Sequence, residues 1–139
     1  MFSNLAVRFY LIKTAAARTL VGPVQIAAEL GPVRDQETGM HFTRMAQYSY
    51  LIALKLREPL GLDDEFIEQL HLFAPLHEIG KIGISGRFLL KPCKLDAGEW
   101  ATMNTHVDIG VPMTGHIIED LQLDEELGAQ VMLDVIGGH

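Results

Sequence analysis

The chain of 139 residues has little that would place it outside the cell or in a membrane. It contains one cysteine, Cys93, so no internal disulfide can form, which fits a reducing compartment and predicts a cytoplasmic protein. No apolar run reaches the roughly 18 to 20 residues that a membrane span requires, so the sequence predicts a soluble globular protein. Arg8 and Lys13 interrupt the apolar N-terminal stretch, which therefore resembles an amphipathic helix more than a signal peptide.

Positive charge is also scarce. Eleven lysines and arginines against 18 aspartates and glutamates give a net charge of −7, which argues against binding to DNA or RNA. The one basic strip spans residues 81–95 and has no acidic residue; its members are Lys81, Arg87, Lys91 and Lys94. Such a strip suits a small phosphorylated substrate, although charge alone is equally typical of a solvated loop.

Alternation of apolar and polar residues with a period of two is absent, so no β-strand is expected. Apolar residues recur instead at steps of three and four, which predicts an all-α protein built as a bundle of about six to seven helices. The length predicts one folding unit. Residues 1–33, closed by Gly31-Pro32, are expected to form a helical arm for packing or dimerisation, and residues 34–139 the functional domain.

The expected helices follow from apolar spacing and from capping residues. They cover residues 39–57, one turn near 87–91, and residues 97–105, 109–121 and 125–136. A further helix is expected to start after Asp63 and Asp64, whose carboxylates suit a helix N-terminus, and to end at His77 and Glu78. The first is expected to bury an apolar face that consists of Met45, Tyr48, Leu51, Ile52 and Leu56. Asp96 and Glu99 have the spacing of a capping box, Trp100 is expected to pack in the core, and His106 is expected at the end of that helix.

Imidazoles and carboxylates recur near the predicted helix ends. Glu37 and His41 are four residues apart, which places both on one helical face; His77 and Glu78 are adjacent, and His106 and His139 follow. Mixed histidine and carboxylate ligands without thiolates favour zinc, manganese or iron, and two or more such ions would suit attack on phosphorus. Taken singly, each of these residues could also be a polar helix end in water.

In order along the chain, these motifs resemble the HD-GYP family of metal-dependent phosphodiesterases, part of the HD-domain phosphohydrolase superfamily. The resemblance rests on Glu37-Thr-Gly-Met-His41, on Leu76-His-Glu-Ile-Gly-Lys-Ile-Gly-Ile84, and on the stretch that leads from Leu90 to His106. It implies an HD-domain-like helical fold, two or three divalent ions that are usually iron or manganese, and hydrolysis of the bacterial second messenger cyclic di-GMP. By position it implies metal ligands at Glu37, His41, His77, Glu78, His106 and His139. It also implies that Lys81 contacts the substrate phosphate and acts in catalysis, with Arg87 and Lys91 as further candidates for the same anion.

Two departures from the family pattern shape the functional hypothesis. Glu78 stands where the family has its namesake aspartate, and the sequence stops at His139, where the family continues with a second histidine, the Gly-Tyr-Pro loop and a helix that carries an aspartate ligand. The sequence therefore predicts a truncated or degenerate phosphodiesterase module of cyclic di-GMP signalling. The alternatives are an inactive interaction or dimerisation module and an HD-type hydrolase of another phosphorylated nucleotide. The missing third predicts exposed apolar surface and self-association as a homodimer.

Overall fold

The computed structural model describes residues 7, 40–120, 122–123 and 128–138. Their helices are α2 (Met40–Leu60), α3 (Asp64–Phe73), the 3₁₀ helix η1 (Ala74–Gly83), α4 (Gly86–Leu89), α5 (Ala97–Asn104), α6 (His106–Asp120) and α7 (Ala129–Gly137). No strand occurs in these ranges, which confirms the all-α prediction. Five of the α-helices have eight or more residues, slightly fewer than expected. The arm predicted over residues 1–33 lies outside the described residues.

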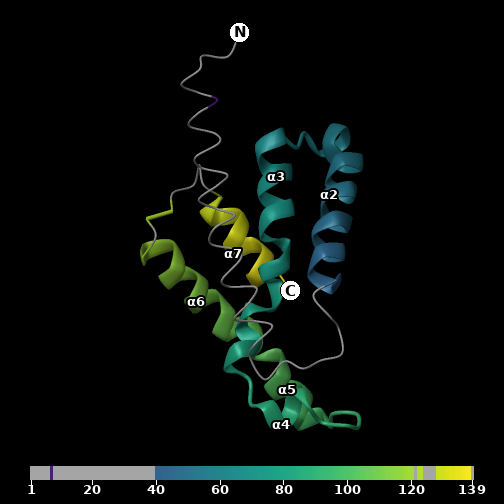
Figure 1. Cartoon of the computed structure of the whole chain (residues 1–139), viewed down its shortest axis with the longest axis vertical. Coiled ribbons are helices and arrows are strands. Elements are labelled where there is room, and N and C mark those ends of the chain that lie inside the picture. The colour runs from purple at the N-terminus through teal and green to yellow at the C-terminus, as the bar shows by residue number, and fades with distance from the viewer. Residues whose placement is uncertain (1–6, 8–39, 121, 124–127, 139) are drawn as a thin grey trace.

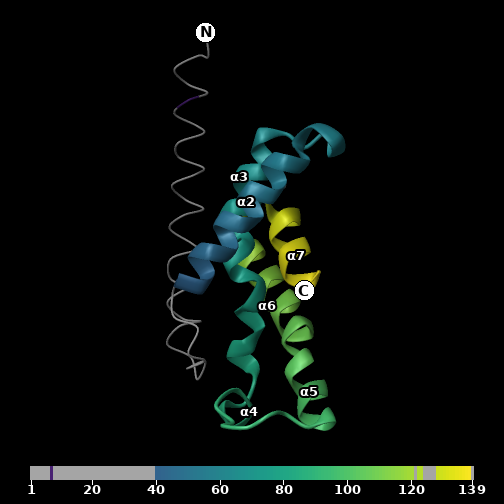
Figure 2. The same cartoon turned by 90° about the vertical axis from the view of Figure 1, so that its right-hand side faces the viewer.

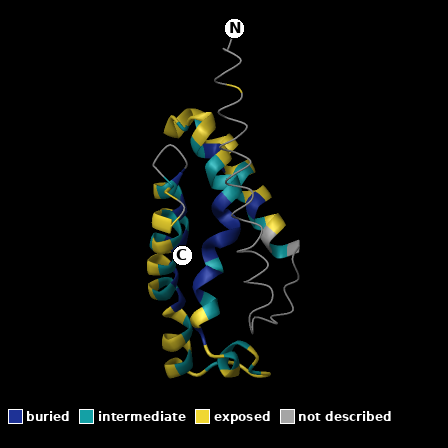
Figure 3. Cartoon of the chain, turned by 60° about the vertical axis from the view of Figure 1, so that its left-hand side comes forward, coloured by how far each residue is buried: buried dark blue, intermediate teal, exposed yellow. Residues whose placement is uncertain are grey.

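The helices form a bundle around the continuous element made by α3 and η1. In Figures 1 and 2, α2 lies against α3 as a helical hairpin, and α4 and α5 lie at the end remote from the α2–α3 turn. Helix α7 packs on both α3 and η1, and α6 packs on η1 and α7. Figure 3 shows buried residues concentrated along this central element, and six of the ten residues of η1 are buried. Within the described ranges, no helix combines the length and apolar character needed to cross a bilayer.

The segment that carries His77 and Glu78 adopts a different helix from the one predicted. An α-helix was expected to start after Asp63 and Asp64 and to reach Glu78, but the α-helix ends at Phe73 and the chain tightens into η1. Pro75 gives a physical reason, because it has no N–H to donate to the carbonyl four residues earlier. A 3₁₀ helix has three residues per turn, so side chains three residues apart lie above one another.

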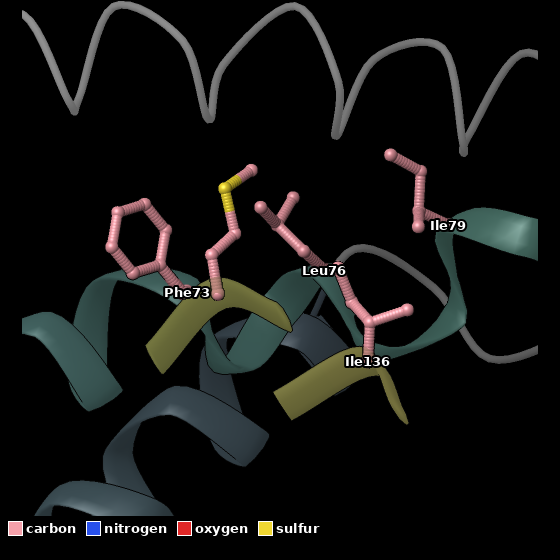
Figure 4. Packing of buried hydrophobic residues seen from close by; sticks show 5 residues of the cluster. Phe73, Leu76, Ile79 and Ile136 are labelled. Carbon is pink, nitrogen blue, oxygen red and sulfur yellow. The ribbon is translucent and has the colours of Figure 1, made fainter. Parts of the chain in front are cut away.

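An apolar row that starts at the last residue of α3 and continues through η1 anchors the domain core. Phe73, Leu76 and Ile79 follow at steps of three and project toward the same side, where they pack with Met132 and Ile136 of α7 (Figure 4). Each of the five is at most 2% exposed. Burying a side chain of this kind contributes about 1.5–3 kcal/mol. This row therefore holds the polar rows of η1 in a fixed orientation.

The apolar face predicted for α2 is not the buried face. Ala46 and Ala53 are 7% and 3% exposed, whereas Tyr48, Leu51 and Ile52 are 58%, 56% and 58% exposed. The backbone carbonyl of Ala46 also accepts a hydrogen bond from the α3 side, at 3.0 Å from His71 Nδ1. Small residues allow two helices to approach closely, and this contact turns the large apolar side chains of α2 outward.

The predicted capping box at the start of α5 is confirmed. The Asp96 carboxylate accepts from the Glu99 backbone N–H at 2.9 Å, and the Glu99 carboxylate accepts from the Asp96 N–H at 2.9 Å. Lys91 Nζ donates to the same Glu99 carboxylate. The bond from Lys91 first, and then the bond from the Asp96 N–H, lower the pKa of Glu99. The bond to Glu99 is in turn the main cause that raises the pKa of Lys91.

Replacing Glu99 with glutamine is expected to destabilise the domain in a pH-dependent way. A folded pKa below the unfolded value means that the carboxylate stabilises the fold above the unfolded pKa and loses this effect as the pH falls through the folded pKa. Urea unfolding should find Glu99→Gln less stable than the parent at neutral pH, and the difference should shrink only as the pH falls below the usual glutamate pKa of about 4.3 and through the lower folded pKa. Glu119→Gln, at an exposed position of α6, is the matched control. A difference that stays constant across this range would contradict the pairing.

Candidate functional site

The structure brings together the predicted site residues of three helices. His41 lies in the first turn of α2, His77, Glu78 and Lys81 lie on η1, and His106 is the first residue of α6. The sequence predicted His106 at the end of the preceding helix, but that helix ends at Asn104, and His106 begins the next. The predicted ligands Glu37 and His139 lie outside the described residues.

Gly80 places η1 against the start of α6. A Cβ built on Gly80 would lie 1.7 Å from the carbonyl oxygen of His106 and 2.7 Å from the backbone nitrogen of Gly110. Only a residue without a side chain permits this approach. Because His77 and Glu78 precede Gly80 by three and two residues, the close packing brings them beside His106.

The carboxylate of Glu78 lies between two imidazoles and an ammonium group. Its Oε1 is 3.9 Å from His77 Nε2 and its Oε2 is 3.6 Å from His106 Nε2. Lys81, one 3₁₀ turn further on, places Nζ 2.7 Å from the same Oε1. The His41 ring lies next to this group, with its centre 6.0 Å from that of His77. The side chains of His77, Glu78 and His106 are 10%, 17% and 9% exposed, so the carboxylate meets the two imidazoles in a mostly buried setting.

Backbone carbonyls orient the two imidazoles. His77 Nδ1 donates to the carbonyl oxygen of Ala74 at 2.8 Å, and His106 Nδ1 donates to that of Met103 at 2.8 Å. A carbonyl only accepts, so in both rings Nδ1 carries the proton, and in the neutral ring Nε2 carries the lone pair. This arrangement, with Nδ1 donating to a carbonyl, is the one that prepares Nε2 of a histidine to bind a metal.

The donor set fits a divalent cation. Neutral imidazole Nε2 atoms and carboxylate oxygens are all electron-pair donors, and at His77, Glu78 and His106 they face one another, which favours a cation among them. Within the part of the chain that the structure describes, no three His, Cys, Asp or Glu side chains are placed to hold one ion together. Metal binding by these residues therefore stays a prediction.

A cavity of about 420 Å³ opens beside this group. Glu78, Lys81 and His106 line it from η1 and α6, while Lys94, Trp100 and Asn104 belong to the residues that line it from the α4–α5 connection and from α5. Sequence reasoning assigned no role in the site to Trp100 or Asn104. Their positions four residues apart on the helix just before His106 place them on one helical face, which could have drawn attention to them.

Trp100 does not pack in the core as predicted. Its side chain is 55% exposed, and α5 has no buried residue. The helix lies at the end of the bundle, where it packs mainly on α4 and α6. The indole therefore contributes to the cavity wall and little to the core.

The remaining predicted anion-binding residues take separate positions. Lys91 lines the cavity but is ion-paired with Glu99. Arg87 stacks on the Phe88 ring, with 4.4 Å between Cζ and the ring centre, and lines a neighbouring hollow with Lys91 and Glu99. Among these three cations, only Lys81 contacts Glu78. The structure therefore places Lys81 at the histidine–carboxylate group and the other two further along the basic strip.

The all-α domain holds a histidine, a carboxylate and a lysine at one cavity, with two further histidines beside them, and these groups suit a metal-dependent phosphohydrolase. Comparison with protein families agrees with this class, because the model of the HD domain matches residues 38–139. The chain belongs to the HD domain family. Phosphohydrolases of this family generally depend on divalent metal ions.

Several proteins that are similar to this chain are named as phosphodiesterases. The chain is 36% identical over 110 residues to a cyclic di-GMP phosphodiesterase of Thermotoga maritima. The aligned region covers 79% of this chain and 28% of the relative. It is 41% identical over 78 residues to the 3′3′-cGAMP-specific phosphodiesterase 2 of Vibrio cholerae, covering 56% of this chain and 14% of the relative. It is 40% identical over 77 residues to the cyclic di-GMP phosphodiesterase response regulator RpfG of Xanthomonas campestris, and the aligned region covers 55% of this chain and 19% of the relative.

These similarities confirm the resemblance to HD-GYP phosphodiesterases that the motifs indicated. The chain spans between 14% and 28% of the lengths of the three relatives, so the similarity concerns one part of each of them.

Proposed function

We propose that this chain is a metal-binding module of an HD-GYP-type phosphodiesterase that hydrolyses cyclic di-GMP. The observation that supports this most directly is the Glu78 carboxylate, which lies 3.9 and 3.6 Å from the Nε2 atoms of His77 and His106 beside a lysine-lined cavity. The names of the relatives from Thermotoga maritima and Xanthomonas campestris support the substrate. The cytoplasm is the proposed compartment, where the exposed thiol of Cys93 would stay reduced.

Each site residue has a role in the proposed reaction. Iron or manganese is the proposed metal, and it would supply the Lewis acidity that hydrolysis of a phosphodiester requires. His41, His77, Glu78 and His106 would hold the metal. The imidazoles of His77 and His106 are kept in place by their hydrogen bonds to backbone carbonyls. Lys81 holds its ammonium group at the cavity, where it would offset the negative charge that develops on the phosphoryl oxygens.

Replacing Lys81 with methionine is expected to lower kcat/KM for cyclic di-GMP by about 100- to 1,000-fold, as removal of one charge-stabilising donor does elsewhere. Methionine keeps much of the unbranched apolar stem and removes the charge. The measurement is hydrolysis by the chain loaded with iron or manganese. Lys55→Met, at an exposed position of α2, is the matched control. Equal rates for Lys81→Met and the parent would remove Lys81 from the mechanism.

The apolar side chains exposed on α2 favour a second function, an interaction or dimerisation module. Tyr48, Leu51 and Ile52 are each more than half exposed and lie on one side of the helix. A large exposed apolar patch marks an interaction site. A metal-loaded chain that hydrolyses no cyclic dinucleotide but elutes as a homodimer in gel filtration would favour this function.

A further inference from the structure

An aromatic side chain lies half exposed beside the proposed catalytic group. Trp100 is 55% exposed, although it is the largest apolar side chain of α5. It lines the same cavity as Glu78, Lys81 and His106. An indole that is left in water beside a polar cavity offers a flat face for an aromatic ligand.

The cavity has the dimensions and the polar groups of a nucleotide site. Its volume of about 420 Å³ falls within the roughly 300–1,000 Å³ typical of small-molecule sites. Lys81 and Lys94 supply positive charge for a phosphate, and Asn104 supplies an amide that can both donate to and accept from a base edge. A ligand with its phosphate at Lys81 can therefore place its base and sugar against the residues of α5 that line the same cavity.

The start of α5 is held firmly, so Trp100 has a defined place. Its neighbour Glu99 accepts from the Asp96 N–H and from Lys91 Nζ, which ties the first turn of α5 to the chain that follows α4. A preorganised aromatic surface loses little conformational entropy when a base stacks on it.

From these observations, and resting on the proposed function, we infer that Trp100 is the residue on which a purine base of the substrate stacks while its phosphate lies at Lys81. This assigns Trp100 to substrate binding and predicts selectivity for purine nucleotides over phosphates that carry no base. Stacking of one base on an aromatic side chain contributes about 1–3 kcal/mol, which corresponds to a factor of about 5 to 150 in Kd.

Trp100 is the one tryptophan of the chain, so its fluorescence reports on the proposed contact without any hydrolysis. Guanosine monophosphate is expected to quench the emission saturably, and ribose phosphate, which lacks the base, is expected to leave it unchanged. Equal quenching by the two ligands, or no binding of guanosine monophosphate, would overturn the inference.

Calorimetric titration of variants with guanosine monophosphate separates stacking from apolar contact. Trp100→Phe keeps an aromatic face and should stay near the parent affinity, whereas Trp100→Leu should weaken Kd by about 5- to 150-fold. Tyr48→Leu, an aromatic residue of similar exposure (58%) on α2, is the matched control and should bind as the parent does. Thermal unfolding of each variant checks that the fold is kept. Parent affinity in Trp100→Leu would overturn the inference.

The outcomes for stacking and for hydrolysis can be told apart. A chain that hydrolyses cyclic di-GMP with an unchanged KM in Trp100→Leu would keep the proposed function and refute stacking. A chain whose binding of guanosine monophosphate depends on Trp100 but which hydrolyses no cyclic di-GMP would keep stacking and refute the proposed function.

Discussion

Replacing Gly80 with alanine is expected to destabilise the domain by at least about 3 kcal/mol, because the new methyl group cannot be accommodated. The Cβ would lie 1.7 Å from the His106 carbonyl oxygen and 2.7 Å from the Gly110 nitrogen. Both neighbours are backbone atoms of α6, so no side-chain rotation can relieve the overlap. η1 and α6 would have to move apart, and Glu78 would separate from His106.

Two other glycines provide a graded control for this variant. A Cβ on Gly83 would lie 2.8 Å from Ile109 Cγ2, a side-chain atom that can shift, so Gly83→Ala should destabilise less than Gly80→Ala. A Cβ on Gly115 would meet nothing within 4 Å, and Gly115→Ala in α6 should raise stability by up to about 1 kcal/mol. Urea unfolding measures all three. Parent stability in Gly80→Ala would show that η1 and α6 do not pack as closely as described.

If Glu78 is a metal ligand as proposed, replacing it with glutamine is expected to weaken the binding of iron or manganese by about 100-fold or more. Loss of a direct ligand should weaken binding more than the roughly 10- to 100-fold that follows loss of a group hydrogen-bonded to a ligand. The amide keeps the size of the side chain but removes the negative charge that lies 2.7 Å from Lys81 Nζ and near two imidazoles. Elemental analysis of protein purified without chelator, followed by calorimetric titration with Mn²⁺, gives the result without a hydrolysis assay.

Two further variants make the Glu78 experiment specific. Glu78→Asp keeps the carboxylate on a side chain that is one carbon shorter and should therefore retain metal. Glu68→Gln, an exposed position on α3, changes the net charge equally and should bind metal as the parent does. If Glu78→Gln retained the metal content of the parent, the group formed by His77, Glu78 and His106 would not be the metal site.

Local signals predicted the local structure well. Asp63 accepts from the Phe66 N–H at 2.7 Å at the start of α3, and Asp96 with Glu99 forms the complete capping box of α5. Each of these interactions joins residues three apart in the sequence, so the sequence contains all the information that they need. The order of the histidine and carboxylate motifs likewise identified the family, because that order is itself a property of the sequence.

Predictions that depended on packing partners were less successful. Tyr48, Leu51 and Ile52 follow helical spacing but remain mostly exposed, since α2 approaches α3 through alanines. Trp100 was expected in the core because large aromatics are usually buried there, but α5 lies where the bundle offers it little to pack against. Periodicity identifies an apolar face, and only the neighbouring helices decide whether it is covered.

Residue spacing and local signals were enough to predict the all-α class and the caps that begin α3 and α5, and to name the candidate residues for metal and phosphate. The tertiary structure decided how these residues meet. It placed His77 and Glu78 in a 3₁₀ helix, so that Lys81 returns to the Glu78 carboxylate after one turn, and it set the Gly80 backbone against His106. The reason is physical: a site built from residues about 30 positions apart forms only when long-range packing brings their helices into contact.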